Sequence, residues 1–148
     1  MRESIGSTAL YNIIITFLSI IFALILGTIV YYQAFKVNKN LVNIIQKYEG
    51  YNNLAVSEID TALSSIGYMR RNLGDCPTRY GSSLVNNSSN PSARKSEFPY
   101  CVYRFSTSGT KYYSFGVLTY IVIDLPLIDT NLIKFGVYSK TDQLYKFN

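Results

Sequence analysis

The chain has two cysteines, Cys76 and Cys101, which are its most reactive side chains. They flank a polar loop, so a disulfide between them would close about 25 residues and stabilise the fold by about 3 kcal/mol. Such a bridge suits an oxidising compartment outside the cytoplasm. The alternatives are two unrelated thiols in a reducing compartment, or a metal site, which would lack ligands because zinc takes four. Because there are two cysteines and both flank the loop, we predict the disulfide.

The remaining titratable residues form no catalytic pattern. Histidine is absent, which removes the usual general base and the commonest metal ligand at neutral pH. A serine nucleophile therefore has no base to activate it, and no phosphate-binding loop, dinucleotide fingerprint or zinc pattern occurs. The carboxylates include no close pair of the kind that acid–base hydrolysis needs. Apart from Glu3 near the amino terminus, they are Glu49, Glu58, Asp60, Asp75, Glu97, Asp124, Asp129 and Asp142. We expect a protein that is not an enzyme and that uses no cofactor or metal.

The chain is basic, with 14 Lys and Arg against 9 Asp and Glu, a net charge of +5. Attraction to anionic lipid, a wall polymer or nucleic acid is one interpretation of this balance. The basic residues are scattered, however, and among them Arg70–Arg71 and Arg94–Lys95 are adjacent pairs. Scattered charge is typical of a solvated surface, so we expect no nucleic-acid partner.

An apolar stretch near the amino terminus predicts a transmembrane helix over residues 9–32, after a short charged head over residues 1–8. It exceeds the roughly 20 residues that an α-helix needs to cross a bilayer. Tyr11, Tyr31 and Tyr32 lie where aromatic rings favour the membrane interface. A cleaved signal peptide is the alternative. The run is longer than the apolar region of a signal peptide and is not followed by a small-residue cleavage site, which favours a retained anchor.

Small and polar residues form one stripe along this predicted span. They recur at spacings of three and four, which places them on one side of a helix. These residues are Asn12, Thr16, Ser19, Ala23 and Gly27. In lipid, helices associate through close approach at small residues and through hydrogen bonds, so the stripe predicts a helix-packing face. The alternative is that such residues are simply tolerated in a membrane helix.

The helix is expected to continue past the membrane as an amphipathic extension over residues 33–49. Val37, Leu41, Ile44 and Tyr48 keep a period of three to four, and Gly50 is the expected stop. The whole helix would be a rod of about 60 Å. A second helix follows, with Ser57 to Asp60 resembling a capping box, an apolar face and a left-handed stop. The face and the stop comprise Ile59, Leu63, Ile66 and Gly67.

The carboxy-terminal part, residues 50–148, is predicted to be an extracytoplasmic α+β domain. Alternating apolar residues indicate an antiparallel sheet of about four strands, interrupted by a flexible polar loop over residues 81–97. Cys101, Tyr103 and Phe105 are expected on one face of their strand. The strand candidates are Tyr68 to Arg71 at an edge, Tyr100 to Phe105, Lys111 to Asp124, Ile133 to Val137, and Leu144 to Phe147. Tyr113, Phe115, Val117, Ile121 and Ile123 are expected on one side of the longest strand.

Two signals for orientation conflict. Lys36, Lys39 and Lys47 follow the span while Arg2 precedes it, which by the positive-inside bias places the domain in the cytoplasm. The cysteine pair and the tyrosine-rich strands favour the outside. We expect a single-pass protein of the cell membrane with its carboxy-terminal domain outside.

A charged head with a glutamate, a membrane helix that continues as a rod, and an antiparallel sheet together resemble the type IV pilin superfamily. Within it, Ala34 to Glu49 and the stretch from Tyr120 to Tyr138 are similar to TadE-like minor pseudopilins. Pilins carry a glutamate five residues after a processing glycine, whereas Gly6 is followed by no acid before Glu49. The resemblance implies that Glu3 pairs with the amino terminus if the chain is unprocessed.

The resemblance implies a structural, non-enzymatic subunit of a cell-envelope filament or secretion system. Its partners would be membrane lipid and other pilin-like or secretion-system subunits, contacted through the amino-terminal helix. The alternative is a stand-alone anchored module outside the cytoplasm that binds or senses a ligand through exposed tyrosine, arginine and lysine side chains. A membrane-anchored enzyme is a third, less favoured hypothesis.

Overall fold

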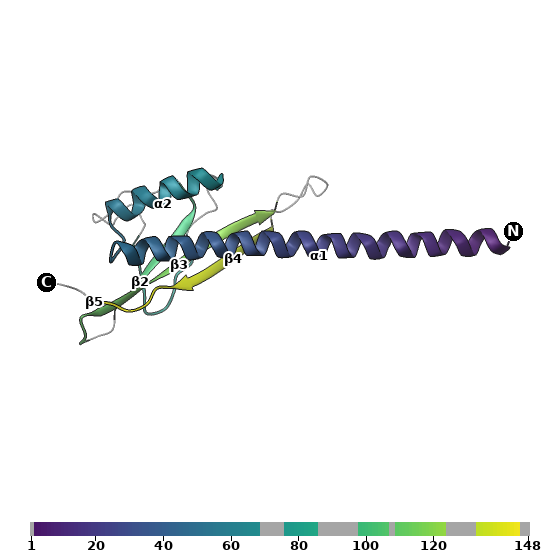
Figure 1. The fold of residues 1–148 in the computed structure, drawn as a ribbon. Coiled ribbons are helices and arrows are strands. Elements are labelled where there is room, and N and C mark those ends of the chain that lie inside the picture. Colours follow the sequence, from purple (N-terminus) through teal and green to yellow (C-terminus); the bar gives the residue numbers. More distant parts are fainter. Residues whose placement is uncertain (1, 69–75, 86–97, 107–108, 124–132, 146–148) are drawn as a thin grey trace. The chain divides into compact units, whose positions relative to one another are not determined.

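The computed structural model describes residues 2–68, 76–85, 98–106, 109–123 and 133–145. It is an α+β protein, as predicted, with a long helix α1 (Arg2–Lys47), a short helix α2 (Asn53–Ile66) and an antiparallel sheet (Figure 1). The chain divides into two units, Met1–Gln33 and Ala34–Asn148. Helix α1 contributes residues to both units.

In the first unit, α1 is an apolar helix whose surface is open. From Gly6 to Gln33 the side chains are exposed, apart from Val30, which is half-buried. One stretch of α1, within Gly6–Lys47, is long and apolar enough to cross a membrane by its length and composition. In water so much exposed apolar surface would be strongly unfavourable, because each buried methylene contributes about 0.8 kcal/mol.

In the second unit, α1 supplies a large part of the hydrophobic core. Its buried residues there recur at helical spacing and are Ala34, Val37, Asn38, Leu41, Val42, Ile44 and Ile45. The helix ends at Lys47, two residues before the predicted end. Glu49 and Gly50 have positive φ, and the amide of Gly50 donates to the Ile45 carbonyl at 2.9 Å. Gly50 is therefore part of the stop, as predicted.

Helix α2 begins five residues earlier than the capping-box pattern predicted. Asn52 is its N-cap, and the Asn52 side chain accepts a hydrogen bond from the Ala55 amide at 2.9 Å. Ser57 lies inside the helix, so the predicted cap at Ser57 was wrong. Ala55 and Val56 are fully buried, which extends the apolar face upstream of the predicted start.

The carboxy-terminal end of α2 agrees with the prediction in one respect and differs in another. Gly67 adopts the predicted left-handed conformation, with φ of 71°. Ile59 and Leu63 are fully buried, but Ile66 is 56% exposed and was wrongly included in the apolar face. Being the last helical residue, Ile66 lies beyond the core.

Within the described residues the sheet has five strands, in the order β1-β2-β3-β4, and β5 pairs with β3. The strands are β1 (Ser83–Leu84), β2 (Tyr100–Ser106), β3 (Tyr112–Ile123), β4 (Ile133–Lys140) and β5 (Leu144–Tyr145). An edge strand was predicted from Tyr68 to Arg71. Tyr68 is not in a strand, so the prediction was wrong there, and residues 69–71 lie outside the described residues. The edge is instead β1, in a segment predicted as loop; residues 86–97 of that loop lie outside the described residues.

Strand β3 is the centre of the sheet and is paired along both edges. It pairs with β2 on one edge, and with β4 and then β5 on the other. Thr141 lies between β4 and β5 and forms hydrogen bonds with Phe115 of β3. Its Oγ1 accepts from the Phe115 amide at 2.8 Å, and its own amide donates to the Phe115 carbonyl at 2.7 Å. Phe115 thus keeps backbone partners where two strands meet.

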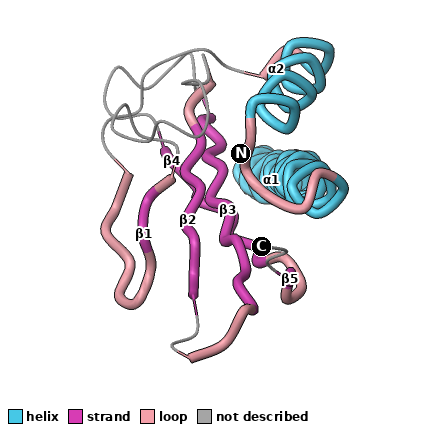
Figure 2. The backbone as a smooth tube through the Cα atoms, turned by 90° about the vertical axis from the view of Figure 1, so that its left-hand side faces the viewer, coloured by secondary structure: helices cyan, strands magenta, loops and turns pink. Residues whose placement is uncertain are grey.

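The two faces of the sheet have different neighbours. On the inner face, Tyr100, Val102, Phe115 and Val117 pack in one core with α2 and with residues of α1. Figure 2 shows α2 and, within the second unit, the end of α1 on this side of the sheet. The outer face carries a second cluster of buried residues, Cys101, Tyr103 and Leu118. The predicted grouping of Cys101, Tyr103 and Phe105 on one face is confirmed, but β2 is buried on both faces.

Asn38 joins α1 to the sheet. It is fully buried, and its Nδ2 lies 3.0 Å from the Val117 carbonyl, 3.1 Å from Thr119 Oγ1 and 2.9 Å from the Val137 carbonyl. One amide group therefore donates to both β3 and β4. A buried donor with such partners fixes the position of the helix against the strands more specifically than apolar packing does.

Candidate functional site

Two surfaces are candidates for function, and the first is the predicted helix-packing stripe on α1. Its five residues, Asn12, Thr16, Ser19, Ala23 and Gly27, lie in the first unit and are exposed. The Thr16 hydroxyl donates to the Asn12 carbonyl at 2.8 Å and the Ser19 hydroxyl to the Ile15 carbonyl at 2.9 Å. A Cβ placed on Gly27 would meet nothing within 4 Å. The stripe thus has open space for a neighbouring helix, and two of its hydroxyls already have partners within α1.

Glu3, the predicted amino-terminal charge, lies in the first turn of α1. Its side chain lies outside the described part of the chain, so its pairing with the amino terminus stays a prediction.

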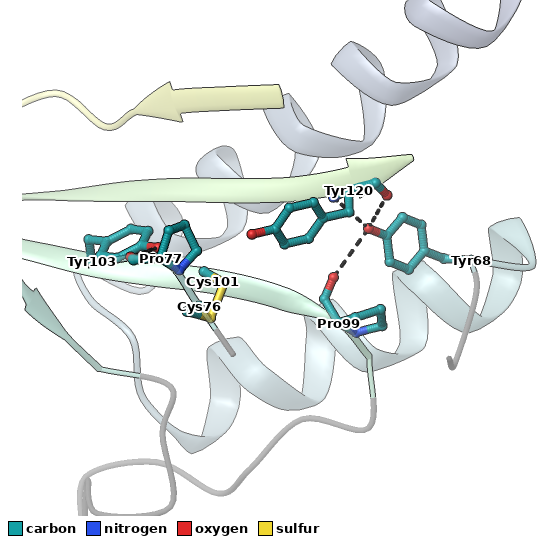
Figure 3. Close-up of a disulfide and its surroundings, with 7 residues drawn as sticks. All are labelled: Tyr68, Cys76, Pro77, Pro99, Cys101, Tyr103 and Tyr120. Carbon is teal, nitrogen blue, oxygen red and sulfur yellow. Dashed lines mark hydrogen bonds between the residues drawn. A yellow bond between two sulfur atoms is a disulfide. The ribbon is translucent and has the colours of Figure 1, made fainter. Parts of the chain in front are cut away.

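The second surface is the outer face of the sheet, where the predicted disulfide is confirmed. Cys76 and Cys101 are bonded, with their Cα atoms 5.8 Å apart (Figure 3). Cys101 in β2 is buried, and Cys76 is half-buried. The bond fixes one end of the segment Cys76–Arg79, which we call the strap, to the middle of the sheet.

The strap also contacts tyrosines of the outer face. The Tyr103 hydroxyl donates to the Pro77 carbonyl at 2.6 Å. The guanidinium of Arg79 lies 3.8 Å from the ring centre of Tyr138 and 5.7 Å from that of Tyr103, so it faces the rings as a cation–π pair does. Burial raises the pKa of Tyr103, which keeps its hydroxyl protonated as a donor.

Gly116 makes room for the ring that Arg79 covers. A Cβ at this position would lie 2.7 Å from Cε2 and 2.8 Å from Cζ of Tyr138. The Tyr138 ring of β4 therefore lies across β3. No sequence pattern marks Arg79, Gly116 and Tyr138 as neighbours, because their proximity depends on strand order and not on spacing along the chain.

A second cation lies over an aromatic ring on the same face. Lys140 Nζ is 4.6 Å from the ring centre of Phe105, and Lys140 is exposed. Arg79 is also exposed. The outer face therefore presents two positive charges next to half-buried aromatic rings, a chemistry suited to anionic or ring-shaped ligands.

Tyr68 joins the end of α2 to strands β2 and β3. Its hydroxyl donates to the Tyr120 carbonyl at 2.7 Å, lies 3.3 Å from the Pro99 carbonyl, and accepts from the Tyr120 amide at 3.1 Å (Figure 3). Burial raises the pKa of Tyr68 to about 12. Burial likewise raises the pKa of Tyr51, whose hydroxyl lies 3.0 Å from that of Tyr100.

Because of these two tyrosines, the second unit is expected to lose stability at alkaline pH. Their pKa is higher in the folded than in the unfolded chain, so stability is full below pH 10 and falls as pH rises toward 12 and above. Each buried tyrosine contributes a slope of about 1.4 kcal/mol per pH unit in that range. Urea unfolding of Tyr68→Phe at pH 9 and pH 11 is expected to show a shallower loss of stability than wild type. An equal loss of stability in Tyr68→Phe and wild type would contradict a contribution of Tyr68 to this pH dependence.

The junction of α1 and α2 holds a polar group outside the core. Lys47 Nζ lies 2.8 Å from Glu58 Oε2, and the Tyr48 hydroxyl donates to the same oxygen at 2.5 Å. The hydrogen bond from Lys47, which has the larger effect, and the one from Tyr48 lower the pKa of the Glu58 carboxyl. The Lys47 side chain is 60% exposed and that of Glu58 is 35% exposed, and ion pairs so accessible to solvent contribute little to stability.

No group of three or more His, Cys, Asp or Glu side chains that could hold a metal occurs among the described residues. Of the carboxylates that follow Glu3 in the sequence, Glu49, Glu58, Asp60 and Asp142 fall in the described ranges. No family model matches the chain, and neither the curated proteins nor the solved structures compared with it include a match.

Proposed function

We propose that the chain is a membrane-anchored, non-enzymatic, pilin-like subunit of a cell-envelope filament or secretion system. It spans the cell membrane once through residues 9–32 and carries its α+β domain outside the cytoplasm. It assembles with other pilin-like subunits through the helix stripe on α1. The observation that carries the proposal is that one helix is apolar and, apart from the half-buried Val30, exposed from Gly6 to Gln33 in the first unit, yet supplies core residues in the second.

The exposed half of α1 supports assembly in a membrane. A helix with so much exposed apolar surface needs lipid or other helices around it. The small residues Ala23 and Gly27 let a second helix backbone approach closely, which is how helices associate in lipid. The disulfide supports the outside location, because such bonds persist in oxidising compartments.

Enlarging the stripe is expected to abolish assembly. A photo-reactive side chain at Ser19 would report contacts of full-length protein in native membranes. Ala23→Leu with Gly27→Leu is expected to reduce cross-linking at least about tenfold, because two leucines hold the helices apart. The measurement is the fraction of protein in cross-linked species after illumination.

The matched control is Thr28→Leu. At about 100° per residue this position lies about 140° around α1 from Ala23 and about 100° from Gly27, off the stripe, and Thr28 is exposed. Its enlargement is expected to leave cross-linking unchanged. Equal cross-linking in the double variant and wild type would remove the stripe from the proposal.

An anchored binding module is the second candidate, favoured by the Arg79 and Lys140 contacts on the outer face. It requires no assembly through α1. Salt-dependent binding of full-length protein to a polyanion such as heparin, lost in Arg79→Ala with Lys140→Ala, together with an absence of cross-links, would select it.

A further inference from the structure

The strap, Cys76–Arg79, lies over the most deeply buried side chains of the outer face. Tyr103 is 1% exposed, Cys101 is 2% exposed and Leu118 is 6% exposed. The strap bonds to two of these three residues, through the disulfide to Cys101 and through the Pro77 carbonyl to Tyr103. It thus helps to cover an aromatic and apolar surface that a sheet without helices on that side would expose.

The two ends of the strap are held differently. At its carboxyl end, a turn leads into β1, in which Ser82 Oγ donates to the Arg79 carbonyl at 2.8 Å and Gly81 takes φ of 72°. At its amino end the disulfide is the covalent tie. Between the ends there are the Tyr103 hydrogen bond and the ring contacts of Arg79, which is exposed.

We propose that the Cys76–Cys101 disulfide is a redox-controlled tie, and that its reduction releases the strap and uncovers Tyr103 while the rest of the second unit stays folded. Among the described contacts, the neutral hydrogen bond from Tyr103 to Pro77 and the contacts of the exposed Arg79 with the rings of Tyr138 and Tyr103 are weak next to the conformational entropy that the strap gains on release. The turn to β1 then acts as the hinge. The proposal goes beyond the proposed function and holds whether or not the chain assembles.

The chemistry requires a thiol reductant, and the structure favours one direction of attack. A thiolate of a dithiol attacks Sγ of Cys76, which is half-buried, and not Sγ of Cys101, which is buried. The Cys76–Cys101 bond breaks, Cys101 leaves as a thiolate and takes up a proton, and a mixed disulfide forms at Cys76. The second thiol of the reagent then displaces Cys76 as a thiol. The protein gains two electrons and two protons, and the dithiol becomes a disulfide.

The contacts of the sheet are expected to keep it folded after the disulfide is reduced. β2 pairs with β3 over its whole length, from Tyr100 to Ser106. Its inner-face residues Tyr100 and Val102 are packed in the core that contains α2. None of these contacts involves the strap, so Tyr100 and its neighbour Tyr51 report on the fold independently of Tyr103.

Tyrosine nitration with tetranitromethane, located by peptide mass spectrometry, tests the proposal on full-length protein in detergent micelles. The protein is nitrated as oxidised, and after reduction by dithiothreitol and alkylation of the thiols. Nitration of Tyr103 is expected to increase at least about tenfold on reduction, because local opening becomes more favourable. Tyr51 and Tyr100 are expected to stay protected, and Tyr80, which is fully exposed, to react equally in both states.

Two variants make the test specific. Cys76→Ala with Cys101→Ala is expected to show the high Tyr103 nitration without any reductant. Arg79→Ala, which keeps the disulfide, is expected to leave Tyr103 protected until reduction. Protection of Tyr103 in the reduced protein would overturn the proposal. Nitration of Tyr51 and Tyr100 together with Tyr103 would also overturn it, because the disulfide would then maintain the whole fold.

Discussion

Replacing Asn38 by aspartate is expected to destabilise the second unit by about 5 kcal/mol, enough to unfold a domain of ordinary stability at neutral pH. Asn38→Asp keeps the side chain's shape but exchanges the Nδ2 donor for a carboxylate oxygen. That oxygen would face the Val117 and Val137 carbonyls, which now accept from Nδ2 at 3.0 and 2.9 Å. Asn38 is fully buried, so water cannot solvate the charge. Urea unfolding of full-length protein in detergent, followed by the near-ultraviolet circular dichroism of its tyrosines, measures the loss.

The matched control for this variant is Asn43→Asp. Asn43 lies in α1 in the same unit and is exposed, so the variant makes the same change of charge without burial. It is expected to change the free energy of unfolding by less than about 0.5 kcal/mol, as exposed substitutions usually do. Similar effects of the two variants would show that Asn38 does not join α1 to the sheet.

Removing the disulfide is expected to lower the free energy of unfolding by about 3 kcal/mol. The bond closes a loop with a sequence separation of 25, and a cross-link of that size restricts the unfolded chain by about this amount. Cys76→Ala with Cys101→Ala is therefore expected to unfold at lower urea concentration than oxidised wild type. The fold should persist, because the β2–β3 ladder does not depend on the bond.

Reductant supplies the control for the disulfide. Dithiothreitol is expected to shift the wild-type unfolding midpoint to that of the double variant and to leave the variant unchanged. A double variant as stable as oxidised wild type would contradict a stabilising role for the bond.

The parts of the fold that follow from local pattern were predictable from the sequence. Alternation placed Cys101 and Tyr103 on one face of β2, and glycine chemistry placed the stops at Gly50 and Gly67. The disulfide was predictable because a chain with two cysteines allows one intramolecular pairing. In each case the determining signal is either a pattern of a few neighbouring residues or the number of cysteines in the chain.

Other features could not be predicted, because they depend on contacts between distant residues. Asn52 and Ser57 are both good N-caps, and what separates them is the burial of Ala55 and Val56 in the core that α2 shares with α1 and the sheet. Asn38 is a polar residue in an amphipathic helix, and its three acceptors lie in strands far along the chain. The stacking of Arg79 on Tyr138 likewise depends on how β4 lies beside β3. Local periodicity carries no information on such pairs.

The thiol chemistry of Cys76 and Cys101 offers the most direct test of the central claim, that α1 anchors the chain with its disulfide-bonded domain outside the cytoplasm. Intact cells expressing the full-length chain are treated with an impermeant maleimide, before and after an impermeant phosphine reductant. A matched control places one cysteine on the other side of the span, as Ser7→Cys in the variant without Cys76 and Cys101. We expect the native cysteines to be labelled only after reduction, and Ser7→Cys only after permeabilisation. Labelling of the native cysteines that requires permeabilised cells would place the domain in the cytoplasm and contradict the proposed function.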